Sequence, residues 1–533
     1  MKSTAAIFAA VLLSVSVLTA CSTNSGTNAE DKSIISSGDS TETKKEKYHY
    51  TLCTGNFGPW DENPKMVKYW EDYFGDVTFE LVYVESNQRA DKINLLIASG
   101  QTPDVMHGVD GRALQEQKVI GGWEESFFRT NAPDLAARMD EQDKSSWALS
   151  KYDGKLMYSI PNFRANNLYA NVIVWRDDWL KKVGIDKIPQ DLSDVEAAFY
   201  KFAKEDPDQN GKNDTYGLSS TTFDSIYGAF GTMRNMWIKN DDGTLSYGDT
   251  LPAAKEAVEL LHKWYKDGVI DPEFITGENE GGYWAISDAF NKNKIGCTGT
   301  GQWYHWHPDL GELGFNGRCT LEFKKTNPNG SFAIGYPPIG PTGKRGTVKQ
   351  DMRVFQSHFS AELVADTGRL ARLLQIANAL DGKDIEMSAA ADMGIKGEDW
   401  DYSEYKGKKI LKCINPELAD PAKQNAIGAG MTFMFINETG SLEYQKMRYG
   451  AAHVWAEESL ADKNYGYINQ IPITLPSSSK YKTELDKILS EGFISIITGD
   501  KPIDYFDEMV KSWKANGGDI LTQEANEWYT VNK

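Results

Sequence analysis

The sequence predicts an α/β protein built from two domains, with a hinge and a cleft between the domains. Three observations lead to this prediction. A β-rich segment, an amphipathic helix and another extended segment follow one another early in the chain, which is the unit of a parallel sheet. The chain of 533 residues is too long for a single hydrophobic core. Two irregular segments also interrupt the regular pattern, as crossings between domains do.

The strand–helix–strand unit occupies the first part of the folded chain. β-rich runs cover Tyr48 to Cys53 and Val77 to Val84. An amphipathic helix is predicted from Asp91 to Ser99, because its apolar residues recur at helical spacing. An extended course resumes from Pro103 to Met106. This order predicts a parallel sheet with its helices packed on it.

Several amphipathic helices follow in the remainder of the chain. Ser193 and Glu196 have the spacing of a capping box, which predicts a helix that continues to Glu205. Hydrophobic stripes predict further helices at 254–267, from Thr367 to Gly382, at 485–497, and from about 502 onward.

Two segments are interpreted as chain crossings between the domains. The first is Ser159 to Asn162, and the second is the proline-rich stretch from Gly335 to Pro341. The resulting prediction has discontinuous domains. Domain 1 takes residues 48–165 plus about 340–405, and domain 2 takes 166–339 plus about 406–533.

The N-terminus indicates export. Lys2 precedes an apolar run from Ala5 to Ala20, which is too short for a permanent membrane span and suits a signal peptide. The run ends in Leu18-Thr19-Ala20-Cys21, which resembles a bacterial lipobox. Residues 1–20 are therefore predicted as a signal peptide and 21–47 as a disordered tether lipidated at Cys21. An ordinary signal peptide with an incidental cysteine is the alternative.

Composition narrows the classes of partner. Hydrophobic residues make up 40% and charged residues 25% of the chain, as in ordinary globular proteins. The formal net charge of −19 argues against nucleic acid and against a polyanion held by the general field. It leaves open a uronic acid bound by a few local basic residues. Cys297 and Cys319 either form a disulfide or remain as buried thiols.

Several motifs together resemble the family 1 extracellular solute-binding proteins of ABC importers, in particular the large lipoproteins of Gram-positive bacteria. The run from Val174 to Ile185 resembles the family's R-x-D-W-L-x-x-L-G signature, with Val183 in place of leucine. The segments 95–105, 206–217 and 513–518 agree as well. The resemblance implies a monomeric, lipid-anchored protein on the outer face of the cytoplasmic membrane. Such a protein captures an oligosaccharide by domain closure and delivers it to ABC permease subunits.

A polar loop after the helix that begins at Ser193 has the spacing of a calcium site. Oxygen-bearing side chains stand at positions 1, 3, 5 and 9, and a backbone carbonyl would serve at position 7. These residues are Asp206, Asp208, Asn210, Asp214 and, for the carbonyl, Lys212. Gly217 stands where an EF-hand has its bidentate glutamate, so we expect a weak, structural Ca²⁺ site. A polar turn without metal is the alternative.

Candidate ligand-binding residues combine aromatic rings with polar groups, because sugars present apolar faces and a rim of hydroxyls. The candidates stand after predicted strands, at a crossing, or in polar surroundings. They are Trp60, Asn162, Arg164, Asn167, Trp303, Tyr304, His305, Trp306 and Trp455. Plain packing is the alternative for each aromatic residue. Four other tryptophans are assigned to the core, namely Trp175, Trp179, Trp264 and Trp513.

The sequence lacks several common catalytic motifs. It has no HExxH, P-loop, G-x-S-x-G or zinc-ligand spacing. The chain is therefore predicted not to be an enzyme. Two alternatives remain: a lipid-anchored carbohydrate-active enzyme with a carboxylate pair, and a lipoprotein that binds peptides or another solute.

Overall fold

The computed structural model describes residues 47–54, 58–84, 88–142, 146–160, 167–276, 284–310, 317–351, 357–381, 383–433 and 441–532. The predicted signal peptide, most of the predicted tether with Cys21, and the candidates Asn162 and Arg164 lie outside these residues. Residues 47–533 belong to one unit, and two large hydrophobic cores form within its described part.

The first core is built on a sheet for which the described residues supply five strands in the order β2-β1-β3-β11-β4. β1 pairs in parallel with β2 and β3, whereas β11 runs antiparallel to β3 and β4. The strands are β1 (Tyr48–Cys53), β2 (Val77–Leu81), β3 (Val105–His107), β4 (Ser159–Ile160) and β11 (Ser357–Phe359). The predicted parallel strand–helix–strand unit is thus confirmed, with its boundaries shifted by a few residues.

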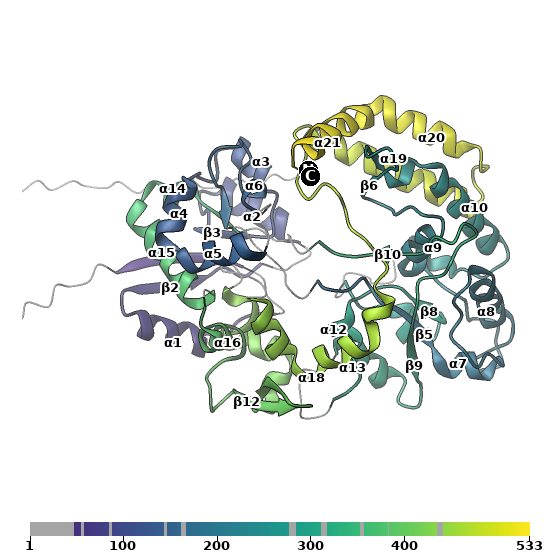
Figure 1. Cartoon of the computed structure of the whole chain (residues 1–533), viewed down its shortest axis with the longest axis horizontal. Helices are drawn as coiled ribbons and strands as arrows, with labels where there is room; N and C mark the ends of the chain where they lie inside the picture. The colour runs from purple at the N-terminus through teal and green to yellow at the C-terminus, as the bar shows by residue number, and fades with distance from the viewer. Residues whose placement is uncertain are drawn as a thin grey trace, which may run out of the picture. The chain divides into compact units, whose positions relative to one another are not determined.

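Helices cover this sheet with their apolar residues. In Figure 1, α4, α5 and α15 lie beside one another, and all three pack together. Trp70 of α1, Phe128 of α4 and Leu373 of α15 are fully buried. The helices of this part are α1 (Lys65–Phe74), α2 (Arg89–Ala98), α3 (Gly111–Glu116), α4 (Glu125–Asn131), α5 (Pro133–Gln142), α6 (Ser146–Leu149), α14 (Ala361–Ala365), α15 (Thr367–Asp381), α16 (Ile385–Met393) and α17 (Pro421–Ala426). We call residues 48–160 and 357–433 the first lobe.

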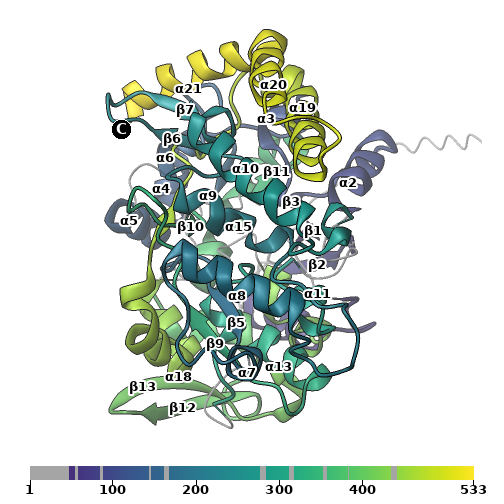
Figure 2. The same ribbon diagram turned by 90° about the vertical axis from the view of Figure 1, so that its right-hand side faces the viewer.

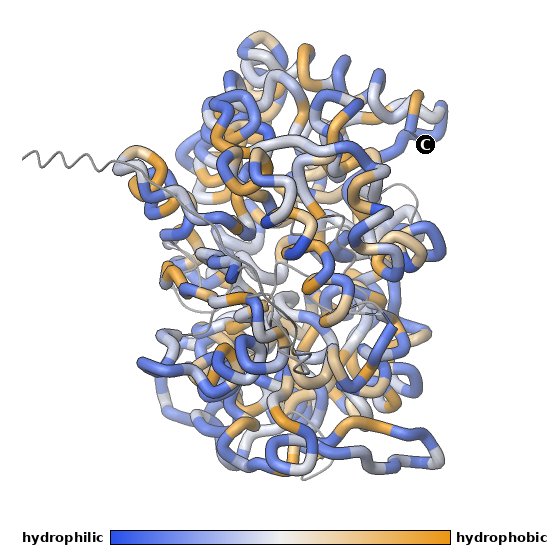
Figure 3. Tube along the Cα trace, turned by 90° about the vertical axis from the view of Figure 1, so that its left-hand side faces the viewer, coloured by the Kyte–Doolittle hydropathy of each residue, from blue (hydrophilic) through white to orange (hydrophobic). Residues whose placement is uncertain are grey.

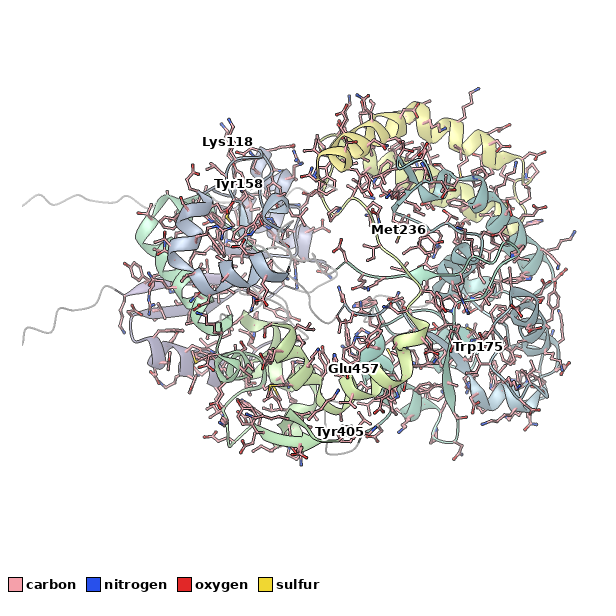
Figure 4. All side chains as sticks on the ribbon, in the orientation of Figure 1. Lys118, Tyr158, Trp175, Met236, Tyr405 and Glu457 are labelled. Carbon is pink, nitrogen blue, oxygen red and sulfur yellow. The ribbon has the colours of Figure 1, made fainter. Side chains whose placement is uncertain are left out.

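The second core is built around an antiparallel sheet whose described strands run in the order β8-β5-β9. Trp175 of β5, labelled in Figure 4, stacks on Phe199 of α8 with ring centroids 5.3 Å apart. The predicted core tryptophans Trp175, Trp179, Trp264 and Trp513 are all buried. The strands are β5 (Ile173–Arg176), β8 (Cys297–Thr298) and β9 (Phe332–Gly335). We call residues 170–348 and 452–532 the second lobe.

The helices of the second lobe include most of the C-terminal segment. α19 packs against both α10 and α20 (Figure 2). The helices are α7 (Asp177–Lys182), α8 (Leu192–Lys204), α9 (Phe223–Ala229), α10 (Pro252–Lys266), α11 (Asp288–Asn291), α12 (Trp303–Trp306), α13 (Arg318–Thr326), α19 (Ser478–Thr498), α20 (Tyr505–Trp513) and α21 (Asp519–Asn532). Two small strand pairs complete the lobe: β6 (Trp237–Lys239) with β7 (Leu245–Tyr247), and β10 (Thr347–Val348) with β14 (Gly466–Tyr467).

The start of α8 differs from the prediction. The helix begins at Leu192 with Asp191 as its N-cap residue, so Ser193 lies inside the first turn. Glu196 forms an ion pair with Lys263 of α10. The capping-box prediction was wrong because the helix begins earlier, so Ser193 is not its N-cap residue.

The stretch from Gly335 to Pro341 stays within the second lobe. Gly335 ends β9, and Ile339 forms a β-bridge with Asp191. The chain enters the first lobe later, between β10 and β11. Ala429 and Phe433 pack in the first core, although the sequence placed 406–533 in the second domain. The domain boundaries as a whole remain a prediction.

Helix α18 (Leu442–Leu460) connects the lobes. Tyr444 packs with Trp400 of the first lobe's β-hairpin, whereas Ala452 packs in the second lobe. The helix kinks at Gly450, which has φ 44° and ψ −115°. The hairpin β12 (Trp400–Tyr405) and β13 (Lys408–Cys413) packs along α18, and Lys408 pairs with Glu457 at 2.6 Å. Figure 4 labels Tyr405 and Glu457 on these two elements.

Cysteines and hydropathy complete the description. The four cysteines among the described residues are free thiols, including Cys297 and Cys319, and the Cys319 thiol donates to the Ala285 carbonyl at 3.1 Å. Hydrophobic and hydrophilic residues are interspersed along the helices (Figure 3). In the part of the chain that the structure describes, no helix has both the length and the apolar character to cross a bilayer.

Candidate functional site

The carboxyl ends of β1 and β3 are the starting point for locating a ligand site. The chain leaves β1 towards β2 on one side, and it later places β3 on the other side of β1. The order in which the chain adds strands to the sheet therefore reverses between β1 and β3. In open α/β sheets, ligands bind outside the carboxyl ends of the strands at such a reversal. We call this part of the first lobe the β1/β3 edge.

An aromatic pair stands at the β1/β3 edge. Trp60, a predicted ligand residue, follows β1 and meets Tyr83, which follows β2, edge to face at 6.1 Å between ring centroids. The Trp60 indole N–H donates to the Thr432 hydroxyl at 2.9 Å. The Thr54 hydroxyl in turn donates to the Thr432 carbonyl at 2.7 Å. Trp60 is half-buried and Tyr83 is 39% exposed, so the pair offers aromatic surface to a solute.

Arg89 brings a positive charge to the same edge. It is the first residue of α2, and its Nη1 atom donates to the carbonyl of His107, the last residue of β3, at 3.3 Å. Burial lowers the pKa of this guanidinium, while the neighbouring Cys53 thiol acts in the opposite direction. Burial raises the pKa of Cys53 to about 11, and Arg89 opposes that shift. Arg89 thus reaches the ends of both β1 and β3.

Strand β11 adds two histidine contacts beside this edge. The His107 ring nitrogen Nδ1 lies 2.9 Å from the Ser357 hydroxyl. Next to it, His358 Nε2 lies 2.5 Å from the Tyr152 hydroxyl. Burial lowers the pKa of His358 to about 4, so its ring is neutral at physiological pH. These contacts place polar side chains beside the edge.

In the second lobe, the predicted aromatic cluster forms α12 directly after β8. Trp303 and Trp306 are fully buried. Trp303 packs against Tyr449 and His453 of α18, with centroids 5.0 and 5.7 Å away. The His305 Nδ1 atom accepts the Gln302 backbone N–H at 3.0 Å and so caps its own helix.

The outer layer of this cluster is less buried. Tyr304 is half-buried and lies 5.5 Å from the ring of Tyr449. Trp284, 43% exposed, stands edge-on to His305. In this conformation Tyr304 and Trp284, rather than Trp303 or Trp306, present surface to solvent. A ligand role for the four α12 residues stays a prediction.

The two remaining described candidates, Asn167 and Trp455, make other contacts. Asn167 is fully buried and donates to the Asp351 carbonyl at 2.7 Å, while its Oδ1 atom is buried without a partner among the described residues. Trp455 on α18 is half-buried and lies 6.5 Å from the ring of His307. Their roles also remain predictions.

The predicted calcium loop follows α8. The Asp206 carboxylate accepts the backbone N–H groups of Asn210 and Gly211 at 3.2 and 3.0 Å. The Asn210 side-chain amide donates to both Asp208 and Asp214, at 2.8 and 3.0 Å. Burial, and then the hydrogen bond with Asp206, raise the pKa of Asp208.

The donor set of this loop suits a hard cation in its chemistry, because its oxygens are the ligands that Ca²⁺ prefers. Two carboxylates already accept hydrogen bonds from the Asn210 side-chain amide. The amide N–H groups thus stand where a cation would otherwise balance the negative charge. Nevertheless, no group of three His, Cys, Asp or Glu side chains within the described ranges is drawn together as a metal site. The Thr215 hydroxyl is engaged with the Phe202 carbonyl at 2.7 Å, so it stabilises the end of α8.

A separate cavity of about 200 Å³ lies in the second lobe. Aromatic and aliphatic side chains line it together with charged groups, among them Phe223, Tyr227, Arg234, Asp249, Leu489 and Phe493. Asp249 is 2% exposed and accepts the Asn235 backbone N–H at 2.5 Å. Burial raises the pKa of Asp249 to about 7, against the effects of that N–H and of Arg234.

Comparison with known proteins defines the family. The profile of a family described as bacterial extracellular solute-binding proteins matches residues 65–350, more than half of the chain. The chain belongs to this family. The predicted relationship to solute-binding proteins is thereby confirmed.

Two curated relatives from Bacillus subtilis match this solute-binding protein over most of its length. Lipoprotein LipO is 24% identical over 498 residues, covering 89% of this chain and 90% of the relative. The polygalacturonan/rhamnogalacturonan-binding protein YtcQ is 24% identical over 477 residues, covering 85% and 86%.

Solved structures confirm the α/β binding-protein fold. The alginate-binding protein AlgQ2, in a crystal structure without calcium ion, superposes with a TM-score of 0.68 at 18% identity, covering 92% of this chain and 100% of that one. The substrate-binding protein FusA of Streptococcus pneumoniae, in complex with kestose, gives a TM-score of 0.66 at 17% identity, with coverages of 92% and 100%.

Sequence reasoning missed several residues of the β1/β3 edge in this solute-binding protein. Tyr83, Arg89 and Thr432 were not among the candidates. A signal for Arg89 was available, because a basic residue at the start of the helix after β2 must lie at the carboxyl end of a parallel sheet. Thr432 gave no such signal, since its contact with Trp60 spans 372 residues.

Proposed function

We propose that this solute-binding protein captures an oligosaccharide outside the cytoplasmic membrane and delivers it to the permease of an ABC importer. The observation that carries the proposal is the aromatic pair of Trp60 and Tyr83 at the β1/β3 edge, in which the Trp60 indole is held by the Thr432 hydroxyl. Aromatic faces pack against the C–H faces of sugars, while fixed hydroxyls and amides pair with the sugar rim.

The named ligands of relatives and structural neighbours point in the same direction. YtcQ is named for polygalacturonan and rhamnogalacturonan, AlgQ2 for alginate, and FusA was solved with kestose. All of these are carbohydrates. Their identity to this chain is low, so they support the ligand class and not a particular sugar.

Capture is proposed to proceed by domain closure around a hinge. A ligand that contacts both lobes stabilises a closed form by its differential contacts, and the permease recognises that form. Tyr304 and Tyr449 are the aromatic side chains proposed for the second lobe's contribution. Gly450, at the kink of the connecting helix α18, is proposed as part of the hinge.

The proposed location is the outer face of the cytoplasmic membrane, with a lipid on Cys21. The lipobox-like Leu18–Cys21 sequence supports this anchor, and the relative LipO is named as a lipoprotein. The tether would allow the folded part to reach the permease.

A structural Ca²⁺ in the loop 206–214 is a second proposal. The carboxylates of Asp206, Asp208 and Asp214, the Asn210 side-chain oxygen and the Lys212 carbonyl would hold the ion. Its charge would neutralise the carboxylates that now converge on backbone and amide N–H groups. The ion would stabilise the loop, apart from the β1/β3 edge.

A thermal-shift screen of the purified chain against neutral and acidic oligosaccharides tests the main proposal. A ligand at 100 times its Kd adds about 2.7 kcal/mol to the stability of the folded state, which raises the melting temperature. Each ligand that raises it is then recovered and analysed. We expect an intact sugar. A cleaved sugar would identify a carbohydrate-active enzyme, and stabilisation by peptides alone would identify a receptor for another solute.

A further inference from the structure

The side chain of Arg89 has hydrogen-bonding capacity that the described residues leave unused. Its Nη1 atom makes a long hydrogen bond to the His107 carbonyl, at 3.3 Å. Its Nε atom is buried and has no acceptor among the described residues. No carboxylate of the described chain forms an ion pair with the guanidinium. Among the described residues, Cys53 is the titratable neighbour whose charge acts on the pKa of Arg89. A half-buried cation in this state is unusual, because buried charges are normally paired.

A glycine next to Arg89 leaves room for the guanidinium group. Gly108 follows β3 with φ +70°, and a Cβ atom there would lie 3.0 Å from Arg89 Nη1. The lack of a side chain at this position lets the guanidinium lie over the end of β3. Together with Cys53 at the end of β1, this places the charge at the strand-order reversal where open α/β sheets bind ligands.

The direction of the unused N–H groups indicates the chemistry of the ligand. With Nη1 turned to His107, the edge formed by Nε and Nη2 remains without a partner among the described residues. That edge presents two parallel N–H donors, which match the two oxygens of a carboxylate. The aromatic pair of Trp60 and Tyr83 stands at the same edge of the sheet and suits the ring of a sugar.

We infer that the β1/β3 edge binds an acidic oligosaccharide and that Arg89 recognises the carboxylate of a uronic acid residue. This inference rests on the proposed function and names the class of its ligand. The net charge of −19 does not oppose it, because a bidentate contact at short range depends on the local guanidinium and not on the distant field.

Calorimetric titrations with three trimers of equal length test the inference: a uronate trimer, its methyl ester and the neutral parent sugar. The wild-type chain should bind the uronate far more tightly than the ester. Arg89→Gln should weaken uronate binding on the order of 100-fold, because it removes one partner of a desolvated charge pair. The same variant should change binding of the ester only slightly. Lys92→Gln, an equal loss of charge at an exposed position on α2, is the matched control and should leave all three affinities unchanged.

A stability measurement separates recognition from a structural role. Arg89→Gln removes a half-buried cation that lacks a carboxylate partner among the described residues, so the ligand-free variant should melt no lower than wild type. Equal losses of uronate and ester binding, together with a lower melting temperature, would overturn the inference. Wild-type binding of the neutral sugar without preference for the uronate would also overturn it, while the proposed function would stand. Binding of none of the sugars would overturn the proposed function itself.

Discussion

The indole N–H of Trp60 donates to the hydroxyl of Thr432 across 2.9 Å, although 372 residues separate the two along the chain. The bond joins the loop after β1 to a segment that the chain contributes after it has returned from the second lobe. It fixes the orientation of a half-buried indole at the β1/β3 edge. The aromatic surface at the candidate site therefore depends on both passes of the chain through the first lobe.

Trp60→Ala is expected to weaken oligosaccharide binding by about 5- to 150-fold, because stacking on one aromatic ring contributes about 1–3 kcal/mol. Trp60→Phe keeps a ring but loses the hydrogen bond to Thr432, so its loss should be smaller. Calorimetry with the sugar found in the screen measures both. Tyr73→Ala, an exposed tyrosine at the far end of α1, is the control. Equal affinity of wild type and Trp60→Ala would remove this residue from the site.

The kink of α18 at Gly450 predicts a stability effect. A Cβ atom at Gly450 would lie 3.0 Å from the Cβ of Ile410, and φ is +44°. Gly450→Ala therefore adds crowding to the strain of a left-handed backbone. Gly407, at φ +75° in the β12–β13 turn, would meet no described atom within 4 Å. We expect Gly450→Ala to lose about 1–3 kcal/mol more than Gly407→Ala in urea unfolding. Equal losses of unfolding free energy in the two variants would show that the Ile410 side chain can move aside with no loss of stability.

Asp249 predicts a pH dependence of stability. Its pKa is about 7 in the folded chain and near 3.8 when unfolded, so the folded state binds more protons between these values. Stability should therefore fall as pH rises through this window. Arg234 and Asp224 are charged neighbours of Asp249 in both wild type and variant.

The variant Asp249→Asn is the comparison, because an asparagine side chain does not titrate in this pH range. Between pH 5 and pH 8, wild type should lose about 2–3 kcal/mol relative to this variant. Urea unfolding of both proteins at the two pH values measures the difference. Parallel pH profiles would mean that Asp249 remains ionised in the folded protein at both values.

Calcium removal tests the loop 206–214. With an affinity in the range of about 10⁻⁴ to 10⁻³ M, 10 mM Ca²⁺ should stabilise the chain by about 1.4–2.7 kcal/mol. Asp208→Asn should abolish most of this gain, because it removes a ligand charge at nearly constant volume. Asp242→Asn, in the turn between β6 and β7, is the control, and Mg²⁺ tests ion selectivity. An identical Ca²⁺ response in Asp208→Asn would place the ion elsewhere.

Local pattern was sufficient to predict the parallel strand–helix–strand unit and the buried Trp175, Trp179, Trp264 and Trp513. Short-range periodicity specifies these features directly. It could not predict that β11 inserts between β3 and β4, since β11 follows β4 by nearly two hundred residues. The late crossing between β10 and β11 was missed for the same reason.

The candidate site shows the same limit. Trp60 was identified because it follows the first strand. Trp303 has an equally suggestive sequence context, yet Tyr449 and His453 of α18 bury it from a distant part of the chain. The place of Arg89 at the start of the helix after β2 could have been read from the sequence. That no described acidic group pairs with it is visible only in the three-dimensional arrangement.

The most direct test of the central claim is hydrogen exchange of backbone amides, with and without a saturating oligosaccharide from the screen. Binding at the β1/β3 edge should slow exchange in the described segments that follow β1, β2 and β3, at residues 58–60, 82–84 and 108–112. Exchange around the second-lobe cavity, at residues 220–235, should stay unchanged. Protection of the cavity with unaltered exchange at the β1/β3 edge would contradict the account.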